Sequence, residues 1–421
     1  MNDTSDLRLL EDFAELFDTK LNDDVRREIR TILSNPLDSL HVIKDRQMIL
    51  KAIMKSELGE VYEYFATDYK EVNYFLNVFD YQAFKSVDYL TYVFLSSHEQ
   101  KRRLVGSYIQ LSYFLTKIEK IFSDNVQIHN YPKSYQTELQ FIIFYIQSFQ
   151  LQKIRKQTSK GKLRYSSVAF LNNIVLEKRK NGDTEKFFKF LNRFEALISI
   201  AKSLKKLKFN FPDFSDSKFK ITQMFHPLLP NPVKNDFEVD LSVVLITGAN
   251  MSGKSTFLKT VGLVVYFAHL GFAIPANAAT IPFYEHISIH INHSDDIKNG
   301  ISHFMQEINN MKNVLLKVKE GKRCFAMFDE LYKGTNYEDA LHISAINING
   351  LSRFINSNFF ISTHIYELKN LICYPINSYY LDSEIIDGLP HFTFKLKEGW
   401  SNIKIGKLLF EKEGIHELLK P

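Results

Sequence analysis

The chain has 421 residues, of which 45% are hydrophobic and 24% are charged, and its formal net charge is +5 at pH 7. This composition is typical of a soluble globular protein, and the length predicts two or three domains rather than one core. The mildly basic charge permits a polyanionic partner without requiring one. Two cysteines, Cys324 and Cys373, exclude a disulfide framework and a zinc cluster, and they favour a reducing compartment.

The N-terminal residues MNDTSDLRLLEDF carry acids and lack a basic segment ahead of an apolar core. We therefore expect no secretory signal and predict a cytoplasmic protein.

Residues 1 to about 210 are predicted to be mostly helical. Stretches such as SDLRLLEDFAELFD and NRFEALISIAKSLKKL place apolar residues at three- and four-residue spacing, and glycine is scarce. The pattern changes near Phe209, where KFNFPDFSDSKF brings Pro212 together with serines and aspartates. Apolar strands separated by helical patterns follow. The expected fold is therefore an all-helical domain over residues 1–215 and an α/β domain over residues 216–421.

One segment of the helical half, KIRKQTSKGKLR, is basic without a single acid. A solvated helix end and loop would have this composition, and so would a surface that contacts the phosphates of a nucleic acid. Both interpretations stay open. The cations in question are Lys153, Arg155, Lys156, Lys160, Lys162 and Arg164, and the run Lys178, Arg179 and Lys180 follows them.

The stretch LITGANMSGKSTFLKT, residues 245–260, fits the phosphate-loop pattern G-x-x-x-x-G-K-[ST]. The apolar run at 241–247 predicts a buried parallel strand ahead of the loop, and a helix is expected to begin near Gly253. Glycines let backbone N–H groups converge on one phosphate at the positive end of that helix. Lys254 is expected to reach the β- and γ-phosphates, and the Ser255 hydroxyl to ligate Mg²⁺. The residues predicted to bind the nucleotide are Gly248, Ala249, Asn250, Met251, Ser252, Gly253, Lys254, Ser255 and Thr256.

The nearly uncharged stretch at 261–283 resembles a membrane span in hydropathy alone. Pro275, Asn277 and Pro282 interrupt it, and it continues the phosphate-loop helix directly. We predict a buried helix followed by a loop, and no membrane partner.

A second strand end supplies carboxylates. In RCFAMFDELYKGTN, the apolar run at 324–328 predicts a strand that ends at Asp329 and Glu330. Asp329 is placed to hold Mg²⁺ through water beside Ser255, and Glu330 to orient or deprotonate the attacking water. The pair favours hydrolysis over storage of the nucleotide.

A third strand end carries a histidine. His364 follows the apolar run of NFFISTHIYEL, where a side chain could sense the γ-phosphate, although a lone histidine is more often structural. The segment DDIKNGISHFMQE, residues 295–307, predicts only a helix start with Ser302 as its cap.

Together these motifs resemble the MutS family of DNA mismatch-repair ATPases. TGANMSGKSTFLK is similar to the family's T-G-x-N-M-x-G-K-S-T loop, and DDIKNGISHFMQE to its D-D-x-x-x-G-x-S-T-F-M-x-E segment. DELYKGTN is similar to D-E-x-x-x-G-T-S, STHIYEL to A-T-H-x-x-E-L, and FKLKEGWSNIKIGKLLFEKEGI to K-L-x-x-G-x-S-x-x-S-Y-G-I followed by A-G-L-P. TILSNPLDSLHVIKDRQMIL looks like the beginning of the family's helical lever domain. The resemblance is strong from about residue 221 onward and loose before it.

The resemblance implies a lever-like domain with a reduced clamp over residues 1–215 and a P-loop ATPase domain of the ABC type over residues 216–421. It implies that the loop binds ATP, that Asp329 and Ser255 hold Mg²⁺, that Glu330 activates water and that His364 senses the γ-phosphate. It also implies that Ser302 reaches across a homodimer to the other subunit's nucleotide. Double-stranded or branched DNA is the implied macromolecular partner.

Departures from the family pattern modify these expectations. The lever-like sequence begins almost at Met1, so we expect no wedge that reads mismatches. Since the chain ends soon after Ile415, we expect dimerisation to rest on the nucleotide interface. Pro232 stands where the family often stacks an aromatic ring on adenine, and Phe225 or Phe237 could substitute for it. The other replaced positions are His303, Asn336, Lys404 and Ile405.

The leading hypothesis is therefore an ATP-hydrolysing DNA clamp of the MutS type, in mismatch repair or related DNA processing. The alternative is an adaptor that dimerises with nucleotide and does not contact DNA. An ATP-binding subunit of a transporter is a third possibility, and the lack of an L-S-G-G-Q segment before Asp329 disfavours it.

Overall fold

A computed structural model describes residues 3–17, 22–62, 66–77, 87–96, 98–249, 251–291, 303–386, 389–401, 410 and 418. The chain divides into two compact units. The sheet unit consists of Met1–Asp12, Pro36–Lys44 and Lys206–Pro421, and the helical unit of Phe13–Asn35 and Asp45–Lys205. The sheet unit thus includes residues 1–12 and 36–44, which the boundary expected at residue 215 assigns to the helical half.

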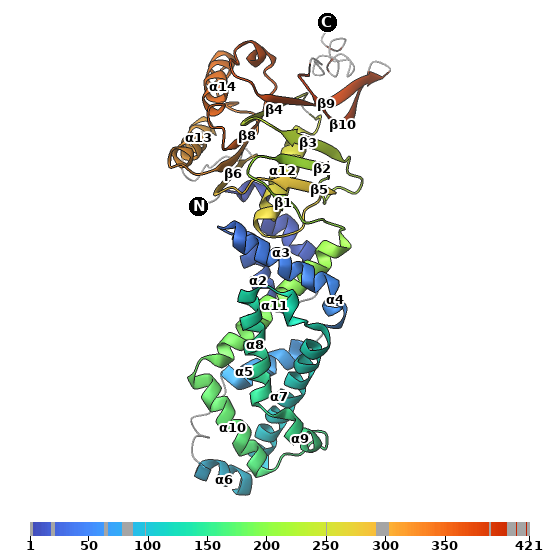
Figure 1. Cartoon of the computed structure of the whole chain (residues 1–421), viewed down its shortest axis with the longest axis vertical. Coiled ribbons are helices and arrows are strands. Elements are labelled where there is room, and N and C mark those ends of the chain that lie inside the picture. Colours follow the sequence, from blue (N-terminus) through green and yellow to red (C-terminus); the bar gives the residue numbers. More distant parts are fainter. Residues whose placement is uncertain are drawn as a thin grey trace. The chain divides into compact units, whose positions relative to one another are not determined.

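The first half of the chain is helical in its described ranges, as its periodicity predicts (Figure 1). A 3-10 helix, Ser5–Leu7, and a π-helix, Leu9–Phe13, come first. The helices are α1 (Ala14–Phe17), α2 (Asp23–Ser34), α3 (Leu40–Lys55), α4 (Leu58–Val61), α5 (Ala66–Asn77), α6 (Val87–Ser96), α7 (His98–Asn125), α8 (Lys133–Ser148), α9 (Leu151–Thr158), α10 (Tyr165–Lys180) and α11 (Asp183–Lys206).

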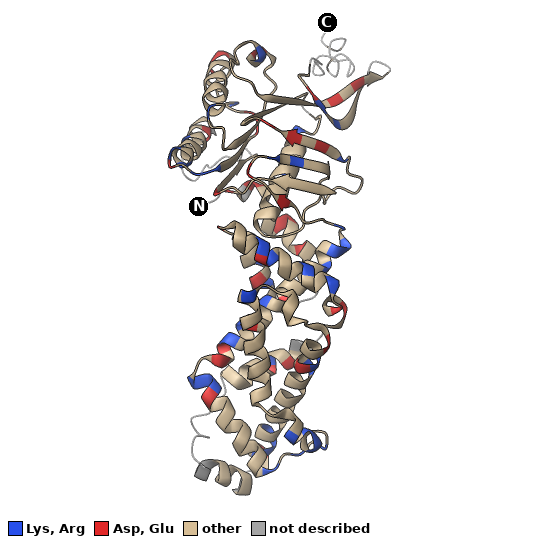
Figure 2. Ribbon diagram, in the orientation of Figure 1, with Lys and Arg blue, Asp and Glu red and all other residues tan. Residues whose placement is uncertain are grey.

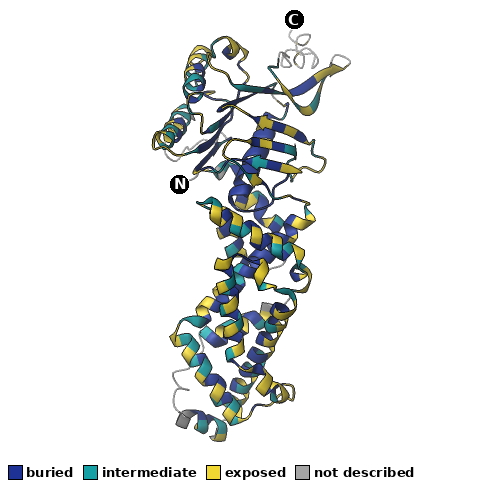
Figure 3. Ribbon diagram, viewed as in Figure 1, coloured by how far each residue is buried: buried dark blue, intermediate teal, exposed yellow. Residues whose placement is uncertain are grey.

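Local signals explain where these helices begin and what they bury. The Asn22 side chain accepts the backbone N–H of Val25 at 2.9 Å and so caps the start of α2. α11 places Phe187 in the core of the helical unit, where its ring stacks on Tyr145 of α8 at 4.3 Å. In Figure 3 the long helices α7 and α10 carry both buried and exposed residues, which is the pattern of amphipathic helices packed around a core.

The second half alternates strands and helices. The strands are β1 (Asp213–Phe214), β2 (Phe219–Met224), β3 (Asn235–Val239), β4 (Val243–Thr247), β5 (Ala278–Ile281), β6 (His286–His290), β7 (Cys324–Phe328), β8 (Asn358–Ser362), β9 (Asn377–Ile386) and β10 (Leu389–Glu398). The helices are α12 (Lys254–His269), α13 (His303–Lys319), α14 (Tyr337–Leu351) and the short turn η5 (Tyr366–Asn370).

These strands form two sheets. The larger has the order β10-β9-β4-β8-β7-β6, in which only β10 is antiparallel to its neighbour, and the smaller has the order β1-β5-β2-β3. In the larger sheet Ile246 lies opposite Ser362, and Phe328 lies opposite Ile361. The carboxyl ends of β4, β8 and β7 therefore meet at one edge, where open α/β sheets bind their ligands.

The larger sheet is covered on both faces (Figure 1). Alternate residues such as Leu245 and Phe359 pack with α13 and α14 on one face. On the other face, Phe360 contacts Phe237 of the smaller sheet at 5.6 Å between ring centroids. Because both faces are buried, β4 and β7 are apolar throughout. The expected class, a helical region followed by an α/β nucleotide domain, is confirmed.

The apolar stretch at 261–283 is interior, as predicted. Nearly all of α12 is buried, and a loop leads from it to β5. No described helix is long and apolar enough to cross a membrane.

Candidate functional site

The phosphate-loop sequence connects β4 to α12, as the pattern predicts. Gly248 has φ +139° and Gly253 has φ +96°, conformations that residues with a side chain rarely adopt. A Cβ atom on Gly248 would lie 2.9 Å from Ser252 Oγ. Met251, with φ +73°, is 74% exposed. The two glycines are therefore required by the loop's shape, and this loop ends at the N-terminus of α12.

Lys254 is folded back onto the loop. Its Nζ donates to the carbonyl oxygens of Gly248 at 2.9 Å and Ala249 at 3.1 Å, and it lies 3.9 Å from Glu330 Oε1. Burial lowers the pKa of Lys254, and the nearby carboxylates of Glu330 and Asp329 only partly offset that effect. The ammonium therefore lies in a buried position where an added phosphate would stabilise its charge.

Asp329 and Ser255 meet at the expected place. Ser255 Oγ donates to Asp329 Oδ2 at 2.5 Å, although 74 residues separate them in the sequence. A hydroxyl and one carboxylate suit Mg²⁺, which takes oxygen ligands and usually completes its shell with water and substrate phosphates. In the described residues, no cluster of three or more His, Cys, Asp or Glu side chains could hold a metal by itself.

Glu330 lies beside two lysines and a histidine. Its carboxylate lies 2.9 Å from Lys333 Nζ, 3.8 Å from His364 Nδ1 and 3.9 Å from Lys254 Nζ. Burial alone would raise the pKa of Glu330, but the hydrogen bond and charge of Lys333, with Lys254 and His364, outweigh it and lower the pKa. The side chain is thus ionised, as a general base must be, and its strongest partner is the exposed Lys333.

His364 follows β8 and is half exposed, with a side-chain exposure of 50%. Its distance of 3.8 Å from Glu330 brings the two predicted catalytic side chains together at the edge where β4, β7 and β8 end.

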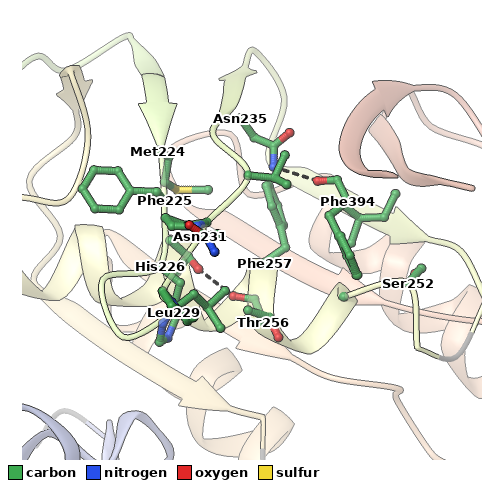
Figure 4. A pocket seen from close by; sticks show the side chains of 16 residues that line it. Met224, Phe225, His226, Leu229, Asn231, Asn235, Ser252, Thr256, Phe257 and Phe394 are labelled. Carbon is green, nitrogen blue, oxygen red and sulfur yellow. Dashed lines mark hydrogen bonds between the residues drawn. The ribbon is translucent and has the colours of Figure 1, made fainter. Parts of the chain in front are cut away.

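A pocket of about 400 Å³ adjoins the end of the loop (Figure 4). Ser252, Gly253 and Thr256 form one wall of it, and Phe225 and Phe394 belong to its apolar lining. The sequence offered Phe225 or Phe237 as the aromatic partner of a base. Phe237 packs instead in the core, where its ring centroid lies 5.5 Å from that of Phe257.

Phe394, which the sequence analysis missed, overlies the loop. A Cβ atom on Gly253 would lie 3.2 Å from Phe394 Cδ1. β10 is irregular between Phe392 and Leu396, and Phe394 has φ +55°. Asn235 holds this bulge, because its amide donates to Phe394 O at 3.0 Å and accepts from Leu396 N at 2.9 Å. No local sequence signal marks such a bulge.

The basic segment forms α9 and the turn after it (Figure 2). Its six cations are exposed, and none pairs with an acidic side chain in the described part of the chain. The following run differs. Lys178 pairs with Asp183 at 3.3 Å, and Arg179 donates to Asn77 O at 2.9 Å, so both serve the fold of the helical unit. The six cations are Lys153, Arg155, Lys156, Lys160, Lys162 and Arg164.

Two predicted site residues, Asn250 and Ser302, lie outside the described residues. The substituted positions Lys404 and Ile405 lie outside them as well.

The phosphate loop after β4, the carboxylates after β7 and the histidine after β8 define an ABC-type ATPase domain, which implies ATP binding. Residues 244–408 match MutS domain V, so this part of the chain is similar to that domain. It is 32% identical over 207 residues to the DNA mismatch repair protein MutS of Thermotoga neapolitana, covering 47% of this chain and 25% of that protein. Against MutS of Listeria monocytogenes it is 30% identical over 226 residues, covering 51% and 26%. MutS of Bacillus pumilus is 28% identical over 228 residues, covering 52% and 26%. The matched part spans about a quarter of the length of these relatives.

Proposed function

We propose that the chain hydrolyses ATP at the edge where β4, β7 and β8 end, and that this reaction controls a dimeric clamp on DNA. The observation that carries the proposal is the convergence of Lys254, Ser255, Asp329, Glu330 and His364 at that edge. Residues from strand ends far apart in the sequence bring a cation, a hydroxyl and two carboxylates together, which is the set that phosphoryl transfer to water requires.

Each side chain has a distinct task. Lys254 leaves the carbonyl oxygens of Gly248 and Ala249 and pairs with the β- and γ-phosphates. Glu330 accepts a proton from the attacking water, or orients that water, once its carboxylate is free of Lys333. His364 donates a hydrogen bond to the γ-phosphate.

Ser255 and Asp329 are the residues that would hold Mg²⁺, through the hydroxyl and the carboxylate. When bound, the ion would supply positive charge that stabilises the negative charge of the phosphates during hydrolysis. Their mutual hydrogen bond of 2.5 Å supports this proposal, because it holds the two oxygens next to each other.

The base of the nucleotide is proposed to enter the 400 Å³ pocket and to stack on Phe394. A volume of this size suits a nucleobase, and its apolar lining favours a flat aromatic ligand. Phe394 is 44% exposed, so its ring is available to a ligand. This assigns to Phe394 the aromatic contact that Pro232 does not provide.

Contact with DNA is assigned to the basic segment from Lys153 to Arg164. Six exposed cations, which have no acidic partner among the described residues, suit a surface that neutralises phosphates and reads no bases. Lys178 and Arg179 make internal contacts, so they are not part of the proposed surface.

A second copy of the chain is proposed to close over the nucleotide. Met251, a residue of the phosphate loop that is 74% exposed, provides an apolar contact for such a partner. Light scattering of Glu330→Ala with and without ATP tests the idea. We expect the dimer fraction to rise with ATP, and a distribution that ATP leaves unchanged would contradict the proposal.

DNA binding separates the clamp from the alternative, an adaptor that dimerises without touching DNA. The clamp requires duplex or branched DNA to bind more weakly as salt rises. Equal, negligible binding at all salt concentrations, together with dimerisation by ATP, would favour the adaptor.

A further inference from the structure

Ser362 occupies an unusual place for a polar side chain. It is the last residue of β8 and is fully buried, in a strand whose preceding residues are mostly apolar. Its hydroxyl oxygen accepts the backbone N–H of Glu330 at 2.9 Å, and the hydroxyl donates to Asp329 Oδ1. A single hydroxyl therefore joins the proposed magnesium ligand to the backbone of the proposed base.

The backbone that Ser362 holds is strained. Glu330 has φ +54° and Tyr332 has φ +62°, although neither is glycine. Such conformations cost free energy and persist only where surrounding contacts fix them. On one side Asp329 N–H donates to His290 O of β6 at 3.0 Å. On the other side Ser362 Oγ accepts a hydrogen bond from the backbone N–H of Glu330. The turn is therefore anchored to β6 and β8, the two strands that flank β7.

The same hydroxyl orients the carboxylate of Asp329. Oδ1 accepts from Ser362, while Oδ2 accepts from Ser255 of the phosphate loop. With one oxygen held inward by β8, the other is presented to Ser255. A carboxylate with a free torsion would not keep this orientation, because its two oxygens exchange by rotation about a soft bond.

We propose that Ser362 is a positioning residue of the hydrolytic site, which fixes Asp329 toward the metal position and holds Glu330 in its strained, productive conformation. The inference rests on the proposed ATPase function and adds to it a residue that touches neither nucleotide nor metal. Hydrogen-bond partners of metal ligands commonly affect metal affinity or activity by about 10- to 100-fold.

The test compares two buried serines, Ser357 directly before β8 and Ser362 at its end. Ser362→Ala removes the hydroxyl at the site. The matched control is Ser357→Ala, because Ser357 is also buried and accepts the backbone N–H of Cys324 at the start of β7, 3.0 Å away. Ser362→Thr restores a hydroxyl. Each full-length variant is titrated with ADP in EDTA and in MgCl₂, and its steady-state ATP hydrolysis is measured.

For Ser362→Ala we expect ADP affinity in EDTA to stay within about twofold of the parent, since the phosphate loop is intact. The gain in ADP affinity on adding Mg²⁺ should shrink by about tenfold, and kcat should fall by about 10- to 100-fold with a smaller change in KM. Ser357→Ala should keep both properties, and Ser362→Thr should recover part of the loss.

The inference would be overturned if the Ser362→Ala and Ser357→Ala variants had the same kcat and the same gain in ADP affinity on adding Mg²⁺. That result would leave the ATPase proposal intact. A parent chain that binds ADP but hydrolyses no ATP with Mg²⁺ would instead overturn the proposed function.

Discussion

Alanine at Gly248 tests whether the shape of the phosphate loop, rather than its charge alone, creates the nucleotide site. At φ +139° a side chain costs about 1–3 kcal/mol of backbone strain. The new Cβ would also lie 2.9 Å from Ser252 Oγ, and Ser252 is fully buried, so a further cost of about 1–3 kcal/mol for overpacking applies. We expect Gly248→Ala to lower the free energy of unfolding of the sheet unit by about 2–6 kcal/mol.

The strain also predicts a loss of affinity. If the loop relaxes to relieve about 1–3 kcal/mol of backbone strain, ATP binding must restore the original shape. The affinity for ATP then falls by about 5- to 150-fold. The control is Gly321→Ala, because Gly321 has φ +84° but an added Cβ would meet nothing within 4 Å. It should cost about 1–2 kcal/mol and leave ATP affinity unchanged.

Urea unfolding and titration with ATP measure the two effects. The reasoning about loop shape is refuted if Gly248→Ala binds ATP as tightly as the parent, or if Gly321→Ala loses as much affinity.

Three further predictions address charge and pH. Lys254→Ala should weaken ATP binding, whereas Glu330→Ala should retain ATP and lose turnover; equal loss of affinity in both would contradict their separate roles. The DNA surface is tested by reversing its cations to glutamate at Lys156, Lys160 and Lys162. Duplex and branched DNA should bind more weakly, and ATP affinity should not change. The slope of log affinity against log salt concentration should decrease by about one unit per lost phosphate contact. DNA binding as tight as that of the parent at low salt would exclude this surface. Burial lowers the pKa of His269 to about 4. In the unfolded chain the His269 imidazole is protonated as pH falls through about 6.5, whereas in the folded protein it stays neutral until about pH 4. The free energy of unfolding therefore decreases as pH falls through this window, by roughly 2 kcal/mol between pH 7 and 5. Urea unfolding of His269→Gln should show a smaller decrease in the free energy of unfolding between pH 7 and 5. A decrease as large as in the parent would contradict this role of His269.

Local pattern was enough to predict the elements that carry the site. The apolar run before Gly248 forms β4, the run at 324–328 forms β7, and α12 begins directly after Gly253. These features depend on residues adjacent in the chain, such as a β-branched run or a glycine turn, and so a single sequence contains them.

Features that depend on distant contacts were beyond such reasoning. Asp3 pairs with the edge of β6, where its N–H donates to Ile287 O at 3.0 Å, yet nothing in the N-terminal sequence marks a strand. Phe394 reaches the loop through a bulge held by Asn235, 159 residues away. Ser362 resembles any polar residue at a strand end until its hydrogen bonds to Asp329 and Glu330 are seen. Tertiary structure, not local propensity, decides each of these.

Steady-state ATP hydrolysis by the full chain with Mg²⁺, measured without DNA and with duplex or branched DNA as salt rises, tests the central claim most directly. We predict hydrolysis that DNA changes at low salt, with an effect that fades as salt screens the contacts of the basic segment. Hydrolysis that no DNA alters at any salt concentration, or no hydrolysis at all, would contradict an ATPase that controls a clamp on DNA.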